Sequence, residues 1–212
     1  MKRKLIAVVL VVALGISTAQ SRDAAGSAFG TLATAQSLGQ GVGALGFGVG
    51  IADATSFVGQ FSYGLSQYTD GRLKFGLIDP DGGETEVTFG ADFKWQFWNV
   101  SPNTTHPFDF GVGAFFEFAD FDAGSVFQIG GQLIASYPIR MRNGTTLSPY
   151  GRFNARLESF SSDSRLQGDD SNLEVGLNGG VKWDVTRDIG LFGEFQLDGN
   201  DGVFFGIDFI VM

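Results

Sequence analysis

Residues 87–97, VTFGADFKWQF, place an apolar side chain at every second position. A period of two puts successive side chains on opposite faces of a β-strand, whereas an amphipathic helix would need a period of about 3.6. One face of this segment carries only Val, Phe, Ala and Trp. The other face carries Asp92, Lys94 and Gln96. The segment is therefore predicted to be a strand with one apolar face and one polar face.

The same alternation recurs along most of the chain. It is found in segments 45–51, 57–65, 73–77, 108–118, 127–137, 147–157, 173–185, 191–197 and 203–211. Turn residues such as Asn143-Gly144 separate the segments, and no connection is long enough for a helical crossover. An antiparallel meander of this kind loses its free edges when it closes. We expect an all-β, antiparallel up-and-down barrel of ten strands. Eight strands are the alternative if the first hairpin or the short 72–78 segment stays outside the wall.

The apolar face of these strands is predicted to meet lipid. It is uncharged and holds most of the 22 Phe residues together with Trp95 and Trp183, a volume that the lumen of a small barrel does not have room for. The polar face is rich in Gly, Ser, Asn and Gln, whereas a water-facing surface would carry more Lys and Glu. A transmembrane barrel fits both features. A soluble, lipocalin-like binding barrel with an apolar interior is the alternative.

The beginning of the chain predicts export. Lys2, Arg3 and Lys4 precede an apolar stretch at 5–16, and Ser17-Thr18-Ala19 supplies small residues for cleavage. About 12 apolar residues are too few to span a bilayer as a helix. We therefore expect a cleaved signal peptide at 1–19, with an uncleaved anchor as the alternative. Residues 20–42 are then a flexible N-terminal lead-in, and residues 43–212 form the barrel.

Composition excludes several kinds of site. The chain has no Cys, one His and a net charge of −9. The chain therefore has no thiolate for a metal centre or a nucleophile, and too few imidazoles for a metal cluster. It also lacks the basic surface that nucleic acid would bind. We expect no cofactor, no metal and no nucleic acid partner.

The segments SPYG at 148–151 and VKWDVT at 181–186 occur within this succession of strands and turns. On these features, residues 43–212 resemble the small bacterial outer-membrane barrels of the OmpA-transmembrane-domain and opacity-protein kind, a porin-like family. The resemblance implies a monomer in the outer membrane of a Gram-negative cell. It also implies contact with lipid and lipopolysaccharide, and insertion by the barrel-assembly machinery. The family usually ends in Phe, whereas this chain ends in Met212.

With the N-terminus in the periplasm, the connections fall into two groups. The expected external loops are 53–55, 79–85, 119–125, 160–171 and 198–202, and the expected periplasmic turns are 68–71, 99–107, 140–145 and 186–189. His106 falls in a periplasmic turn without a fixed acidic neighbour, so we expect no enzyme. An outer-membrane enzyme that uses His106 is the alternative.

Two motif matches are explained by strands and turns. The glycines of GVGALG at 41–46 precede a further strand and not the helix of a nucleotide site, so they are expected to make room inside the barrel. The acidic residues of the turns lack the spacing of an EF-hand. They are Asp79, Asp81, Glu84, Asp198 and Asp201.

The polar face of the strands is expected to place seven charged residues in the lumen. They are Lys94, Glu117, Arg152, Arg156, Glu174, Lys182 and Glu194. We expect Lys182 to pair with Glu194, and Arg156 to lie near Glu158 and Glu174. Buried charges persist when they are paired, so the mixed signs favour a filled lumen and a structural or surface-interaction role. The alternative is a charged constriction in a narrow channel for small solutes.

Overall fold

The computed structural model describes residues 29–52, 54–80, 85–98, 108–121, 124–162, 170–199 and 201–212. A strand forms in each segment in which polar and apolar residues alternate. Successive side chains point to opposite faces of a strand, so the polar ones point into the barrel and the apolar ones point outward. Their bounds are β1 (Gly43–Ile51), β2 (Ala54–Ser66), β3 (Thr69–Pro80), β4 (Glu86–Trp98), β5 (Asp109–Phe121), β6 (Gly124–Ser136), β7 (Ile139–Arg140), β8 (Thr146–Ser162), β9 (Asp170–Asp184), β10 (Ile189–Leu197) and β11 (Gly202–Ile210).

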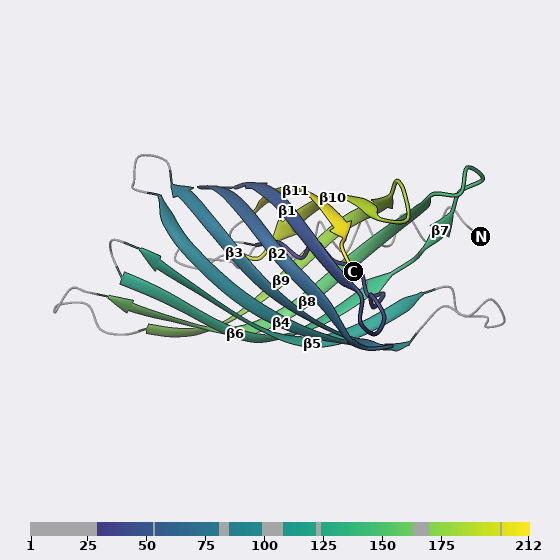
Figure 1. Ribbon diagram of the computed structural model, residues 1–212. Coiled ribbons are helices and arrows are strands. Elements are labelled where there is room, and N and C mark those ends of the chain that lie inside the picture. The colour runs from purple at the N-terminus through teal and green to yellow at the C-terminus, as the bar shows by residue number, and fades with distance from the viewer. Residues whose placement is uncertain are drawn as a thin grey trace, which may run out of the picture.

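Ten of these strands close into one antiparallel barrel (Figure 1). Neighbours in sequence pair with each other, and the seam is closed by β1 and β11, from Ala44 opposite Ile210 to Ile51 opposite Val203. The short β7 pairs only with β8 and lies in a hairpin that projects from one end of the wall, so β6 pairs directly with β8. The predicted ten-strand, all-β barrel is confirmed. The eight-strand alternative is wrong, because the first hairpin and β3 both belong to the wall.

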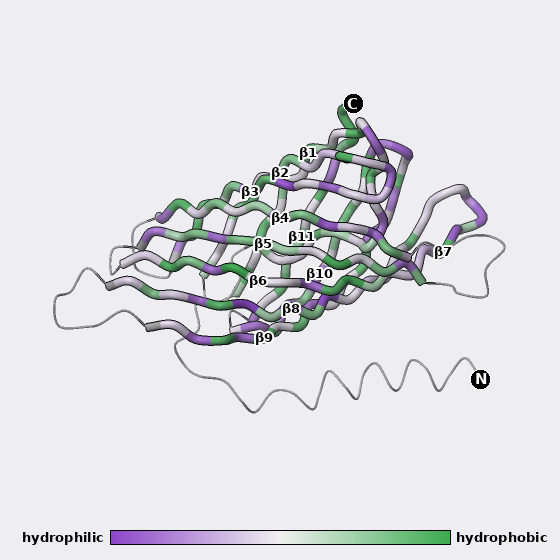
Figure 2. Tube along the Cα trace, turned by 90° about the horizontal axis from the view of Figure 1, so that it is seen from below, coloured by the Kyte–Doolittle hydropathy of each residue, from purple (hydrophilic) through white to green (hydrophobic). Residues whose placement is uncertain are grey.

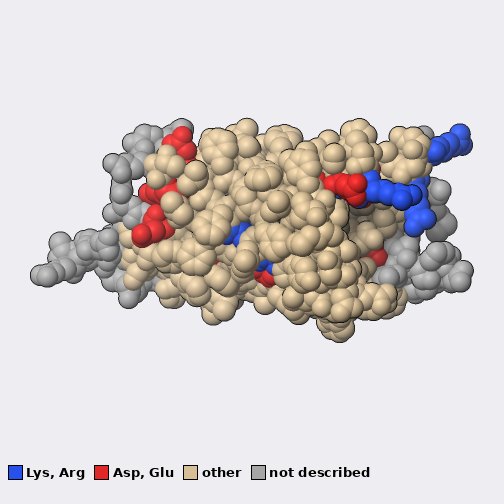
Figure 3. All heavy atoms as spheres, in the orientation of Figure 1, with Lys and Arg blue, Asp and Glu red and all other residues tan. Residues whose placement is uncertain are grey.

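The two faces of the wall differ sharply in chemistry. Neighbours on β3 illustrate the difference: Phe75 is 67% exposed, whereas Lys74 is 2% exposed. Figure 2 shows the resulting alternation of hydrophobic and hydrophilic residues along the strands. The middle of the face seen in Figure 3 is almost entirely uncharged. In the part of the chain that the structure describes, no helix is long and apolar enough to cross a membrane.

Residues 29–42, which we call the lumen segment, run inside the barrel before β1 begins. Phe29, Leu32 and Ala35 are 1%, 3% and 0% exposed. Residues 29–35 are thus packed against the inner wall, whereas the sequence led us to expect a flexible lead-in over residues 20–42. The signal peptide expected at 1–19, and residues 20–28 of the lead-in, lie outside the described residues.

Candidate functional site

The inner wall of β3, β4 and β5 carries a row of ion pairs. Residues directly opposite each other in the sheet register form two of them, because their side chains leave the same face at the same level. Arg72 of β3 reaches Asp92 of β4 at 2.6 Å, and Lys94 of β4 reaches Asp70 of β3 at 3.1 Å. Lys74 pairs with Glu117 of β5 at 2.9 Å.

Arg156 anchors a second group of charges on β8. Its side chain is fully buried, and it lies 3.5 Å from a carboxylate oxygen of Glu158 and 3.6 Å from one of Asp198. Its guanidinium also donates to the backbone carbonyl of Asp198 at 2.7 Å. Glu174 stands opposite Arg156 in the register and is half-buried. The expected proximity of Arg156 and Glu158 is present, but Asp198 belongs to the lumen and not to an external loop.

Arg152 lies further along the same strand. Its Nε donates to the side-chain oxygen of Gln132 on β6 at 2.8 Å. Its guanidinium carbon stands 4.7 Å from the ring centroid of Phe115, a distance at which a cation is attracted to an aromatic face. Phe115 is one of the few large apolar residues that point inward.

The partner of Lys182 differs from the expected one. Its ammonium lies 3.1 Å from Asp184 and 3.2 Å from Asp208 of β11, so the expected pairing with Glu194 is wrong. The register places Phe192 opposite Lys182 and Gly190 opposite both Asp184 and Asp208. Gly190 has no side chain to separate them, and the long side chain of Lys182 therefore reaches across β10 to Asp208.

Glu194 instead binds the lumen segment. Its carboxylate accepts hydrogen bonds from the backbone N–H groups of Thr31 at 2.6 Å and Leu32 at 2.8 Å. It also accepts from the Tyr150 hydroxyl at 2.5 Å and from the Asn178 amide at 2.8 Å. Four donors around one carboxylate replace the water that this buried charge would otherwise need.

Charged residues of β3 and β4 bind the rest of the lumen segment. Arg72 donates to the carbonyl of Thr31 at 2.7 Å. Lys94 donates to the carbonyls of Thr34 at 2.8 Å and Gln36 at 2.7 Å. One oxygen of Asp70 accepts from the Ser37 hydroxyl at 2.6 Å and from the Leu38 N–H at 3.1 Å.

A small polar cavity lies beside the lumen segment. Its volume is about 60 Å³, and its lining combines Leu32 and Thr34 of the segment with Arg72, Asp92 and Lys182 of the wall. A space of this size and polarity has room for a few hydrogen-bonded waters.

Sequence reasoning missed the apolar part of this site. Leu32, Tyr150, Phe192 and Phe204 form a buried cluster next to Glu194. The available signal was a set of large apolar residues in the otherwise polar register, namely Phe115, Phe192 and Phe204. Such residues need a partner inside the barrel, and the lumen segment provides part of it.

The remaining sequence expectations concern the ends of the barrel. His106, Asp81 and Glu84 lie outside the described residues. Asp198 and Asp201 are joined through a 3.1 Å hydrogen bond from the Asp198 N–H. Over the described ranges, no group of three or more His, Cys, Asp and Glu side chains is arranged to hold a metal ion.

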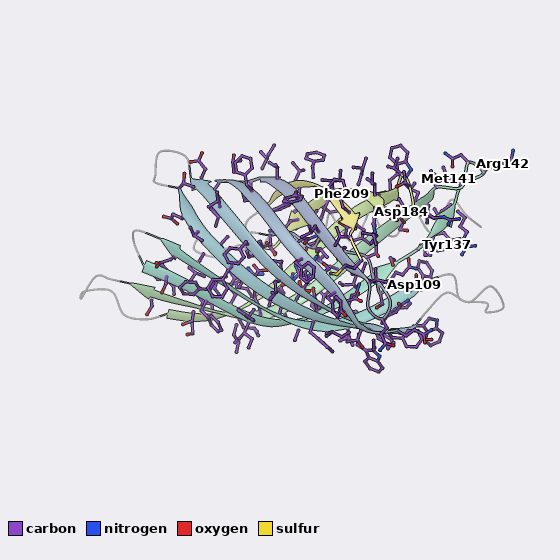
Figure 4. The ribbon with its side chains drawn as sticks, viewed as in Figure 1. Asp109, Tyr137, Met141, Arg142, Asp184 and Phe209 are labelled. Atoms are coloured by element: carbon purple, nitrogen blue, oxygen red, sulfur yellow. The ribbon has the colours of Figure 1, made fainter. Side chains whose placement is uncertain are left out.

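The outer surface at one end carries a chain of aromatic rings. Trp95, Phe97, Phe110, Phe108 and Tyr137 follow one another across β4, β5 and the end of β6, with ring centroids 5.3–6.3 Å apart. Tyr137 is one of the labelled residues at this end of the wall, near Met141 and Arg142 of the projecting hairpin (Figure 4). Aromatic girdles of this kind mark the lipid–water boundary of membrane barrels.

An uncharged outer band, an aromatic girdle and a polar, charged lumen together define a membrane-spanning β-barrel. This chain is similar in structure to the N-terminal β-barrel domain of Pseudomonas aeruginosa OprF. The match covers 82% of this chain and 99% of that domain, with 13% identity and a TM-score of 0.41. A structure described as KdgM porin matches 80% of this chain and 99% of its own length, with 7% identity and a TM-score of 0.42. No family model and no curated protein matches the sequence.

Proposed function

We propose that the protein is an integral outer-membrane β-barrel whose lumen is closed, with a structural or surface-interaction role. Lipid and lipopolysaccharide would surround the apolar band. Because each of the ten wall strands pairs on both sides, the barrel has no strand edge left to recruit a second copy, and we expect a monomer. The proposal assigns no catalysis to the chain.

The observations that support the proposal are the ion pairs of the wall and their hydrogen bonds to the lumen segment. Wall charges on both sides are paired and buried, as with Arg72 and Asp92 or Arg156 and Asp198. The lumen segment occupies the space between them and bonds to β3, β4 and β10. An ion crossing this interior would have to displace paired charges without a continuous water shell, which is energetically costly.

The two ends of the barrel support an orientation. Exposed basic residues Arg140 and Arg142 lie at the end where the chain terminates, whereas exposed Asp79, Asp120 and Asp201 lie at the opposite end. In Figure 3 the left end of the visible face shows acidic but no basic side chains. We propose that this acidic end faces the outside of the cell and carries any surface interaction.

Single-channel recording tests the closed lumen. The protein is refolded in detergent, its folding is checked by the mobility shift between unboiled and boiled samples on a gel, and it is added to a planar bilayer. The proposal expects a folded protein that produces no discrete current steps. Regular steps from the folded wild-type protein would overturn it.

A narrow channel for small solutes is the second candidate, and the polar cavity beside the lumen segment is the observation that favours it. This candidate expects current steps whose size changes in Lys182→Ala, because Lys182 lines the cavity. The exposed Arg187→Ala provides a control with the same loss of charge outside the lumen.

A further inference from the structure

The inner wall is shaped around the lumen segment at the level of individual residues. We propose that the lumen is a binding site for an extended peptide, that the lumen segment is its tethered occupant, and that withdrawal of the segment opens a conducting pore. The inference rests on the proposed closure of the barrel and adds the identity of the removable part.

The polar half of the site recognises peptide backbone. Glu194 binds two successive N–H groups, and Arg72 and Lys94 together bind three carbonyl oxygens of the segment. Every wall group in this set is nine-tenths or more buried. Charged side chains that bond to a neutral backbone are stronger partners than neutral ones, and they select an exposed main chain over a helix or a paired strand.

The apolar half of the site consists of sockets left by glycines. Gly48 of β1 and Gly206 of β11 stand opposite each other in the register. A Cβ atom added to Gly48 would lie 2.8 Å from Leu32 Cδ1, and one added to Gly206 would lie 3.2 Å from it. A Cβ atom added to Gly76 would lie 3.1 Å from the ring of Phe29, and one added to Gly90 would lie 3.2 Å from it. The side chains of the segment thus fill the places where the wall lacks its own.

The segment is held in a way that permits withdrawal. Among the described residues, its backbone bonds to a strand backbone only at its C-terminal end, where Gly41 and Val42 meet Gly64 of β2 at 2.8 Å and 2.9 Å. Its Leu32 has a φ of 40°, a backbone conformation that is strained for a residue with a side chain. Its departure would leave the wall charges with partners of their own. Arg72 keeps Asp92, Lys94 keeps Asp70, and Glu194 keeps Tyr150 and Asn178.

The first test changes the segment and leaves the wall intact. Leu32→Asp places a carboxylate in the buried cluster with Tyr150, Phe192 and Phe204, where its loss of hydration is costly. Gln40→Asp adds the same charge to the same segment at an exposed side chain and serves as the matched control. We expect current steps from folded Leu32→Asp in a planar bilayer, and silence from wild type and from Gln40→Asp.

The peptide site itself is tested on the opened variant. A synthetic peptide with the sequence of residues 29–38, FGTLATAQSL, should block the current of Leu32→Asp. The same peptide with Asp in place of its Leu at position 32 should not block it. Current that neither peptide alters would overturn the assignment of a peptide site.

A thiol reporter tests withdrawal independently of conduction and of Leu32. The chain has no Cys, and Thr31 is 1% exposed, so Thr31→Cys introduces one buried thiol beside Glu194. Adding Glu194→Gln removes the charge that holds Thr31 and Leu32. We expect a water-soluble thiol reagent to label this double variant roughly tenfold faster, the effect of losing one charge-assisted hydrogen bond. Glu158→Gln, a buried carboxylate held by Gln128 and Arg156, should leave labelling slow.

The outcomes separate this inference from the proposed function. Current from the wild-type barrel contradicts the closed lumen itself. A silent wild type together with a folded, silent Leu32→Asp and equal labelling of both Glu variants preserves the closed lumen but overturns the removable segment. If Leu32→Asp fails to fold, the labelling comparison alone decides the inference.

Discussion

The hydroxyl of Tyr150 on β8 donates a hydrogen bond of 2.5 Å to the carboxylate of Glu194 on β10. One strand, β9, separates the two residues, and both stand opposite Gly180 in the register. A Cβ on Gly180 would lie 2.7 Å from the Tyr150 oxygen. The missing side chain at Gly180 therefore lets two residues on non-adjacent strands meet inside the barrel.

Loss of this hydroxyl should destabilise the barrel. We expect Tyr150→Phe to lower the free energy of unfolding by about 1.5–3 kcal/mol, because the buried carboxylate loses a donor. The measurement is urea unfolding in lipid vesicles, followed by Trp fluorescence. Tyr137→Phe removes a hydroxyl from a residue that is 39% exposed, and a loss of similar size there would contradict the explanation.

Charge on the outer face should be costly in proportion to its depth in the membrane. Phe93 lies near the middle of β4 and is 47% exposed on the outer face. We expect Phe93→Arg to cost about 2–4 kcal/mol, and Tyr137→Arg, at the aromatic girdle, to cost about 0–1 kcal/mol. Equilibrium unfolding in vesicles measures both. The reverse order would mean that the apolar register does not face lipid.

Removal of Arg156 should be more damaging than removal of an exposed arginine. Arg156→Ala leaves Glu158 and Asp198 buried without their cation, for which we expect a loss of about 3–5 kcal/mol. Arg142→Ala, at an exposed position, should change the free energy of unfolding by less than about 0.5 kcal/mol. Adding Asp198→Asn to Arg156→Ala should restore part of the lost free energy of unfolding, because it removes one of the two unpaired buried charges. If the double variant is instead less stable by about another 3–5 kcal/mol, the pairing of Arg156 with Asp198 is contradicted.

The sequence was sufficient for the wall of the barrel because the wall depends on a local pattern. A period of two places Phe93 and Lys94 on opposite faces of the wall whatever the rest of the chain does. The partners of inward side chains depend on gaps that no local pattern shows. Lys182 bonds to Asp208 because Gly190, a residue on the strand between them, leaves the space open.

The lumen segment was missed for a related reason. Its residues are small and polar and lack alternation, which is typical of a flexible lead-in. Its burial comes from contacts with distant residues, such as Glu194, which lies 163 positions after Thr31. Of the glycines at 41–46, Gly46 lies beside the inward side chain of Gln60, whereas the sequence did not show that Gly48, two residues later, makes room for Leu32.

The central claim is that the barrel spans a membrane with its apolar register facing outward. Depth-resolved quenching of Trp fluorescence is the most direct test of this claim. Trp95 and Trp183 are 51% and 43% exposed on the outer face, toward the same end as the aromatic girdle. The protein is refolded in vesicles whose lipids carry bromine at defined depths along the acyl chain. We expect strong quenching by bromine near the headgroups and weaker quenching by bromine near the chain ends. Trp fluorescence that no brominated lipid quenches, from a folded protein that stays in solution without detergent, would contradict the account.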